Sequence, residues 1–301
     1  MGAVEIHDGT SVGTLVRVGE RCVLATLALS VGRRIQIGTL IDHIWDDGPP
    51  ENAEQTVATY ARAVRRAIIR GGGQPGWLSS HRPGAYQLNV PPDVVDHRRF
   101  SVLVGTARSE QRAGNPSRAV AAYQQAVELR RGESLADVTG QWARNQRYAL
   151  EQEYLDTVCA LYEQQLAIGE FAAVATSATR LITEVVPTDR MIVLAMSGLA
   201  GAGQHAGITE LVERAARRMW DTAQAEPSAE IHAIARTLVA RPGARLTVPP
   251  QTDRSTTELH DDFPETSTPD RRPDSRPAVI LTASHNGRVN QAAGDQYITD
   301  L

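Results

Sequence analysis

The chain has 301 residues, of which 42% are hydrophobic and 22% are charged, so most of it has the apolar content that a buried core needs. At roughly 150 residues per domain, this length predicts about two domains. The formal net charge of −4 excludes a globally basic nucleic-acid binder but not a locally basic one. Every cationic side chain is an arginine, whose planar guanidinium group can hold a phosphate or a guanine through two hydrogen bonds.

Cysteine content and hydropathy exclude several other classes of protein. Cys22 and Cys159 are too few for a disulfide scaffold or a multi-cysteine zinc site, and we expect both to be inert core residues. No apolar run reaches the ~18 residues of a membrane helix, and the N-terminus lacks a signal-peptide pattern. We therefore expect a soluble, cytoplasmic protein without a membrane partner. Metal-ligand spacings and nucleophile motifs are lacking, so we expect no enzyme, no catalytic residues, no metal and no cofactor.

The N-terminal region begins with strands and continues with helices. Residues 4–18 alternate between apolar and polar in the manner of strands, with a turn signal at Asp8-Gly9. Apolar residues then recur at helical spacing, which predicts helices over 20–31, 37–46 and 52–70.

A β-hairpin is predicted after the third helix. That helix starts at Asn52, a good N-cap with Gln55 three positions on, and glycines follow it. Trp77-Leu78 and residues 86–90 read as the two strands, with Arg82 in the turn between them. Strands, three helices and a hairpin in this order are the layout of a winged helix-turn-helix, whose third helix enters the major groove of DNA.

The predicted helix 52–70 has two chemically distinct faces. Its core stripe consists of Val57, Ala61, Val64 and Ile68. The opposite face carries side chains that can read bases or hold phosphates: Asn52, Gln55, Thr59, Arg62, Arg66 and Arg70. Residues 51–90 contain five arginines and two glutamates, a local charge of +3. The alternative interpretation of this face is an ordinary solvated helix surface.

The remainder of the chain divides into three parts. Residues 96–240 read as helical throughout, with helix pairs at roughly the 34-residue tetratricopeptide period. Residues 241–284 contain seven prolines among polar residues, which predicts a disordered linker, although strand character returns at Val279. Residues 285–301 form a short β-prone motif that loosely resembles amyloid-signalling motifs; a floppy tail or a strand docked on a partner edge are the alternatives.

The order of motifs resembles the SARP family, the Streptomyces antibiotic regulatory proteins. Several stretches carry the likeness to the OmpR-like winged helix of these proteins: Leu27-Ala28-Leu29, Ile44-Trp45-Asp46-Asp47-Gly48-Pro49-Pro50, Val64-Arg65-Arg66-Ala67-Ile68 and Arg82-Pro83-Gly84-Ala85-Tyr86. Others resemble the bacterial transcriptional activation domain that follows it: Val95-Asp96-His97-Arg98-Arg99-Phe100, Glu184-Val185-Val186-Pro187 and Glu226-Pro227-Ser228-Ala229-Glu230. The predicted fold class is therefore mainly α with a small β component. It comprises an N-terminal winged helix over 1–95, a TPR-like helical domain over 96–240 and a disordered C-terminal tail.

The resemblance implies a transcriptional activator that binds direct repeats in promoter DNA as a homodimer and contacts RNA polymerase and its sigma factor. It places the DNA contacts on helix 52–70 and Arg82, and Arg33 and Arg34 after the first helix are further candidates for phosphate contacts. It places contacts to polymerase or the DNA backbone in the 45–52 loop, where Asp46, Asp47 and Glu51 are the candidates. The regulated genes would be those of secondary metabolism.

Two departures favour a second hypothesis. The N-terminal sheet looks abbreviated, and Ala63 stands where the family commonly has an arginine directed at DNA. A helical-repeat adaptor or signalling scaffold, whose winged helix no longer binds DNA, is therefore the alternative function. Gly198, Gly201 and Gly203 superficially suggest a phosphate loop, but no strand precedes them, so we expect an inter-helix turn.

Overall fold

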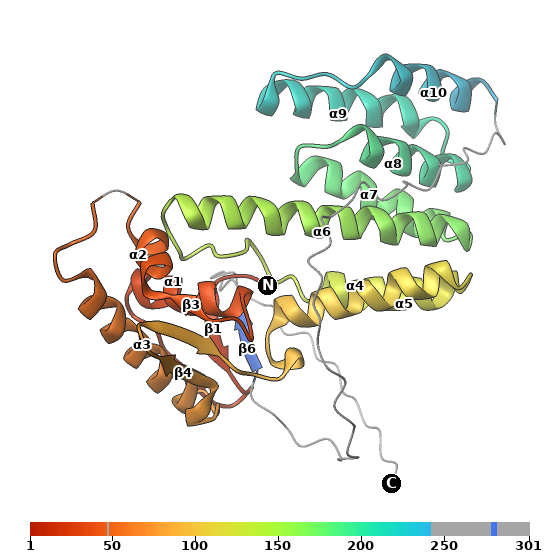
Figure 1. Ribbon diagram of the computed structural model, residues 1–301. Coiled ribbons are helices and arrows are strands. Elements are labelled where there is room, and N and C mark those ends of the chain that lie inside the picture. The colour runs from red at the N-terminus through yellow and green to blue at the C-terminus, as the bar shows by residue number, and fades with distance from the viewer. Residues whose placement is uncertain (47, 242–277, 282–301) are drawn as a thin grey trace, which may run out of the picture.

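The computed structural model describes residues 1–46, 48–241 and 278–281 (Figure 1). Asp47, most of the predicted linker and all of the predicted 285–301 motif lie outside the described residues. The architecture is mainly helical with two small sheets, which confirms the predicted fold class. An α/β unit built from the first 90 residues lies beside stacked helices, and one long helix runs past both (Figure 1).

The first sheet joins the two ends of the described chain. Strands β1 (Val4–His7) and β2 (Val12–Gly13) form a hairpin, and β6 (Ala278–Leu281) pairs with the other edge of β1. The β1–β6 pairing is antiparallel, with Val4 opposite Leu281 and His7 opposite Ala278. The strand character expected from Val279 onward is therefore confirmed, and within the predicted linker 241–284 only Ala278 departs from the prediction of disorder in these four residues. Their apolar, β-branched run suits a strand, and β1 offers it an unpaired edge.

The winged helix follows in the predicted order. It comprises α1 (Val18–Leu29), β3 (Ile35–Gln36), α2 (Ile37–Ile44), α3 (Ala53–Arg70), the short helix η1 (Pro75–Trp77), β4 (Leu78–His81) and β5 (Ala85–Leu88). The second sheet has the order β3-β5-β4. Strand β3 was not predicted, because its two residues are too few to show alternation.

Antiparallel helix pairs build the second unit. After the short helix η2 (Pro92–Val94) come α4 (Asp96–Arg112), α5 (Pro116–Glu128), α6 (Gln141–Ala167), α7 (Phe171–Glu184), α8 (Asp189–Gly201), α9 (Gly207–Ala223) and α10 (Ala229–Ala240). Gly198 lies where α8 crosses α7, and a Cβ there would meet the Ala175 amide nitrogen at 2.7 Å. This glycine therefore allows close helix packing, and the predicted inter-helix turn begins after Gly201.

The long helix α6 belongs to both hydrophobic cores. Ala143 and Leu150, in its N-terminal half, pack with the winged-helix core, as do Leu135 and Val138 from the preceding loop. Val158, in its C-terminal half, packs with the helical core. The predicted division of the chain at residue 95 thus follows the order of the elements, whereas the packing continues across it.

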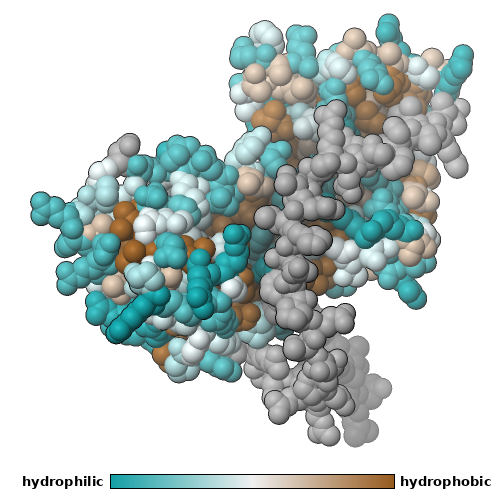
Figure 2. All heavy atoms as spheres, viewed as in Figure 1, coloured by the Kyte–Doolittle hydropathy of each residue, from teal (hydrophilic) through white to brown (hydrophobic). Residues whose placement is uncertain are grey.

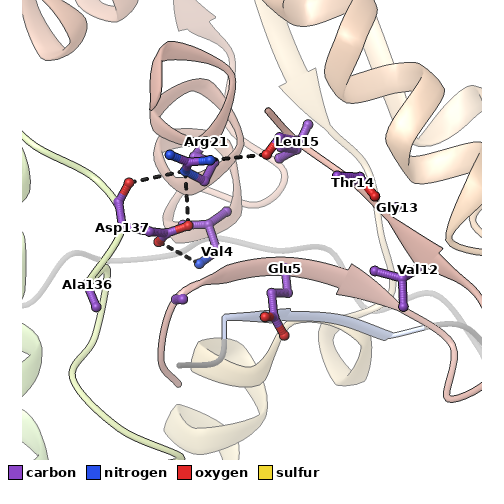
Figure 3. Close-up of a pocket in the computed structure, with 10 residues that line it drawn as sticks. Val4, Glu5, Val12, Gly13, Thr14, Leu15, Arg21, Ala136 and Asp137 are labelled. Atoms are coloured by element: carbon purple, nitrogen blue, oxygen red, sulfur yellow. Dashed lines mark hydrogen bonds and ion pairs between the residues drawn. The ribbon is translucent and has the colours of Figure 1, made fainter. Parts of the chain in front are cut away.

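A polar cluster reinforces this junction next to a cavity of about 360 Å³ (Figure 3). The Arg21 guanidinium on α1 pairs with the Asp137 carboxylate at 3.0 Å and also donates to the Leu15 carbonyl. The Val4 amide donates to the same carboxylate at 2.9 Å. Asp137, from the helical unit, therefore fixes both α1 and β1.

Candidate nucleic-acid interface

Helix α3 presents its predicted polar face to solvent. Val57, Ala61, Val64 and Ile68 are at most 1% exposed, which confirms the predicted core stripe. All six residues predicted on the opposite face are exposed: Asn52, Gln55, Thr59, Arg62, Arg66 and Arg70. Figure 2 shows hydrophilic side chains gathered over the side of the molecule where α3 and β4 lie in Figure 1. The helical unit does not cover this row within the described residues, so the row is accessible to a large partner.

Hydrogen bonds order part of this row. The Arg62 Nη2 donates to Thr59 Oγ1 at 3.0 Å, and that hydroxyl donates to the Gln55 carbonyl at 3.0 Å. At the other end of the helix, the Arg70 guanidinium donates to the Thr14 carbonyl at 3.4 Å. Arg62 and Arg70 therefore have intramolecular contacts, while Arg66 lies between them on the exposed face.

Asn52 occupies the predicted N-cap position, but it does not cap through its side chain. Its backbone lies at φ −101° and ψ 28°, and no hydrogen bond joins its side chain to the first turn of α3. The capping box expected from Asn52 and Gln55 is thus wrong in its contacts, although the helix starts where predicted. The reason is the backbone conformation, since a capping side chain requires an extended N-cap residue. Both side chains remain exposed.

Arg65 connects α3 to the wing. Its Nε donates to the Leu78 carbonyl at 3.1 Å, and its Nη2 donates to Ser80 Oγ at 3.0 Å. The position of Arg65 near the core side of α3 predicts a structural ion pair; its hydrogen-bond partners are instead neutral groups on β4. Burial raises the pKa of the Tyr86 phenol on β5, and the charges of Arg65 and Arg62 partly oppose that rise. Arg65 therefore positions the wing and is turned away from the exposed row.

The wing and the turn before β3 carry the remaining basic candidates. Arg82, in the wing turn, and Arg33 and Arg34, after α1, are all exposed. Gly84 has a φ of +123°, which a side chain would rarely adopt, and its carbonyl accepts from the Ile37 amide at 2.9 Å. The wing turn is thereby tied to the start of α2.

The turn that carries Arg33 and Arg34 is hydrogen-bonded to strand β5 of the second sheet. The Gly32 amide donates to the Leu88 carbonyl at 2.9 Å, and the Gln87 side chain donates to the Gly32 carbonyl at 2.7 Å. The turn with Arg33 and Arg34 is thus anchored on β5, and the wing turn is anchored on the start of α2.

The three residues predicted to contact polymerase lie in different surroundings. Glu51 is exposed, and Asp47 lies outside the described residues. Asp46 is bonded within the chain: its Oδ1 accepts from the Gln141 amide at 2.7 Å, and its Oδ2 lies 3.9 Å from Arg144 Nη2. Trp45 is half-buried and stacks on Tyr60, with ring centroids 6.4 Å apart, which agrees with a packing role.

Sequence reasoning missed the contacts that α6 makes with α2. His43 stacks on Trp142 with ring centroids 4.6 Å apart and an interplanar angle of 14°. The available signal was Trp142 itself, a large aromatic residue in the first turn of an otherwise polar helix segment. Nothing in the local pattern named its partner.

Two kinds of feature are absent from the described part of the chain. No helix there is long and apolar enough to cross a membrane. No group of three or more His, Cys, Asp or Glu side chains there is arranged to hold a metal ion.

The described residues thus combine a winged helix, whose third helix has an exposed polar face, with a unit of stacked helices. Residues 95–239 match the family model described as the bacterial transcriptional activator domain. This part of the chain is therefore a bacterial transcriptional activator domain, and the chain resembles transcriptional regulators of the SARP family.

Several curated proteins are similar over most of the chain. It is 29% identical to the regulatory protein DnrI of Streptomyces peucetius, over 76% of this chain and 88% of that protein. It is 27% identical to the transcriptional regulator RedD of Streptomyces coelicolor, over 76% of this chain and 66% of RedD. It is also 27% identical to the regulatory protein AfsR of the same organism, over 87% of this chain but only 25% of AfsR.

A solved structure shares the fold. Mycobacterium tuberculosis EmbR, in complex with a low-affinity phosphopeptide, superposes with a TM-score of 0.66 at 21% identity. The match covers 75% of this chain and 60% of EmbR. This likeness supports the winged-helix plus helical architecture described above.

Proposed function

We propose that this protein is a sequence-specific DNA-binding transcriptional activator. Helix α3 lies in the major groove, with Gln55, Arg62 and Arg66 directed at base edges and phosphates. The observation that carries this proposal is the exposed polar row on α3, set beside a wing that Arg65 fixes to the same helix. Arg82 in the wing, and Arg33 and Arg34, then contact the flanking backbone. The protein needs no cofactor and performs no catalytic step.

The proposal extends to partners and targets. The protein binds direct repeats in a promoter as a homodimer and contacts RNA polymerase holoenzyme through its sigma factor. Glu51 is an exposed acidic residue of the 45–52 loop that supports this contact, whereas the carboxylate of Asp46, which is also exposed, is bonded to α6. The relatives DnrI and RedD, both regulators from Streptomyces, support genes of secondary metabolism as targets.

The test is a gel-shift titration of Arg66→Ala on DNA from the gene's own upstream region and from neighbouring promoters. Removing a base- or phosphate-contacting arginine costs about 1–3 kcal/mol of binding free energy, or about 5- to 150-fold in Kd. Arg180→Ala is the matched control, because Arg180 is likewise an exposed arginine on a helix, but on α7 in the helical unit. Equal affinity of wild type, Arg66→Ala and Arg180→Ala for every promoter tested would overturn the assignment of α3 as the reading helix.

The alternative function, a helical-repeat adaptor or signalling scaffold, has one structural observation in its favour. Arg62 and Arg70 both have intramolecular hydrogen bonds on the face that would meet DNA. Affinity capture of the full chain from its own cells, followed by sequencing and mass spectrometry, separates the two functions. Enriched promoter DNA supports the activator, while protein partners without DNA support the adaptor.

A further inference from the structure

Asp46 caps the start of α6 from outside that helix. The residue before α6 is Gly140, at φ +105°, and it has no side chain with which to cap the helix. The Asp46 carboxylate instead accepts from the Gln141 amide, the first amide of the helix, at 2.7 Å. A negative charge there also meets the favourable end of the helix dipole. A Cβ on Gly140 would lie 3.3 Å from Asp46 Oδ1, so the glycine leaves room for this approach.

His43, one turn earlier, is held from two sides. Its ring stacks on Trp142 of α6, and its Nδ1 lies 3.2 Å from the hydroxyl of buried Thr26 on α1. Its main-chain carbonyl accepts from Cys22 Sγ at 3.3 Å. Burial lowers the pKa of the His43 imidazole, which favours a neutral ring in the stack. The C-terminal end of α2 is therefore clamped between α1 and α6.

Helix α6 is itself rigidly fixed in the helical unit. Its 27 residues make a rod of about 40 Å. Near its far end, Arg190 of α8 donates to Glu163 Oε1 through Nε at 3.0 Å and through Nη2 at 2.8 Å. A displacement of the packed repeats therefore reaches Gln141 and Trp142 through one continuous helix.

We propose that Asp46, His43 and Trp142 form a latch through which the helical unit sets the conformation of residues 48–52, the segment that leads into α3. With the latch closed, Asp46 is held against the start of α6. The segment 48–52 then keeps Glu51 in one position relative to α3. Opening the latch frees the segment without unfolding either core. The latch itself follows from the contacts alone, and only its consequence for transcription rests on the proposed function.

The test measures hydrogen exchange by mass spectrometry on the full chain. Asp46→Ala removes the acceptor of the Gln141 amide, and Trp142→Leu removes the stack but keeps an apolar side chain. Asp46→Asn, which retains Oδ1 as an acceptor, is the conservative variant. Asp42→Ala, which removes an exposed acidic residue on α2 four positions before Asp46, is the control for loss of charge.

We expect Asp46→Ala and Trp142→Leu to raise exchange in peptides covering 45–56 by about fivefold, the value of one lost hydrogen bond or stack. Exchange in 57–70 and in α8 stays at the wild-type rate, and Asp46→Asn and Asp42→Ala resemble wild type. Unchanged exchange of 45–56 in both latch variants would overturn the proposal. A rise spread over the whole winged helix would overturn it too, because it would show a merely structural role.

A second part of the test measures promoter binding and transcription with the same variants. We expect Asp46→Ala to keep a DNA Kd within about twofold of wild type while run-off transcription falls at least about fivefold, since the arginines of the groove-facing row lie beyond the segment that the latch sets. Loss of DNA binding together with transcription would contradict the separation that the latch predicts. If wild type itself binds no promoter, the proposed function fails, and the exchange experiment still decides on the latch.

Discussion

Arg65 on α3 donates to the main-chain carbonyl of Leu78 on β4 at 3.1 Å, so one side chain connects the proposed reading helix to the wing. A second bond from the same guanidinium reaches Ser80 Oγ at 3.0 Å. The distance between the groove-facing row and the wing turn is therefore set by hydrogen bonds to a half-buried charge. Such bonds are stronger than those between neutral partners.

Arg65→Ala should lower the stability of the chain and weaken DNA binding indirectly. The variant leaves the Leu78 carbonyl without this partner and removes charged hydrogen bonds, which costs about 1–2 kcal/mol at a partly exposed site. Thermal unfolding measures the first effect. Arg62→Ala is the control, because the bond that Arg62 makes stays within α3. Identical melting of Arg65→Ala and Arg62→Ala would contradict the positioning role.

The salt dependence of DNA binding should identify the phosphate contacts. Each arginine that neutralises a phosphate contributes about 0.9 to the slope of log K against log salt concentration. We expect Arg82→Ala to reduce this slope by about 1 and the double variant Arg33→Ala/Arg34→Ala by about 2. Titrations at four salt concentrations provide the slopes. A slope that stays at the wild-type value in both variants would remove these turns from the interface.

Local pattern was sufficient wherever a residue's role depends on its near neighbours. The stripe of Val57, Ala61, Val64 and Ile68 is buried as its spacing predicts, because a regular helix puts those positions on one side. Glycine and proline signals placed the ends of the helices within a few residues, since these two residue types determine which backbone angles are accessible. The exposed row on α3 follows from the same periodicity.

Contacts between distant segments were beyond this reasoning. The Asp46 carboxylate and the Gln141 amide are 95 residues apart, and any exposed acidic residue near a helix start would have fitted the pattern equally well. The strand character of Val279–Leu281 was visible, but its partner was not, because strand pairing depends on which edge is free in the folded chain. Arg65 illustrates the intermediate case: its side of the helix was predictable and its hydrogen-bond partners were not.

The two thiols should be unreactive in the folded chain. Cys22 and Cys159 are 2% and 3% exposed, and burial raises the pKa of each to about 12. A raised pKa keeps the thiol protonated, so at pH 8 only about one part in ten thousand is the reactive thiolate. We expect negligible alkylation by iodoacetamide at pH 8, and complete alkylation of both after unfolding in urea. Rapid modification of either thiol in the native chain would show that its core is open.

Strand β6 should stabilise the winged helix, because it covers the edge of β1 and lies beside α4 and η2. Two truncations separate this strand from the rest of the tail: one ends at Leu281 and keeps β6, and the other ends at Pro277 and removes it. Loss of a four-residue ladder costs about 1–3 kcal/mol and leaves an edge that invites self-association. We expect the shorter form to melt at a lower temperature and to sediment as larger species, while the form ending at Leu281 behaves as the full chain.

A synthetic peptide spanning 276–283 should restore the melting temperature of the shorter form in a concentration-dependent manner, since it refills the same edge. Equal melting of the two truncated forms would show that the β1–β6 pairing contributes nothing to stability.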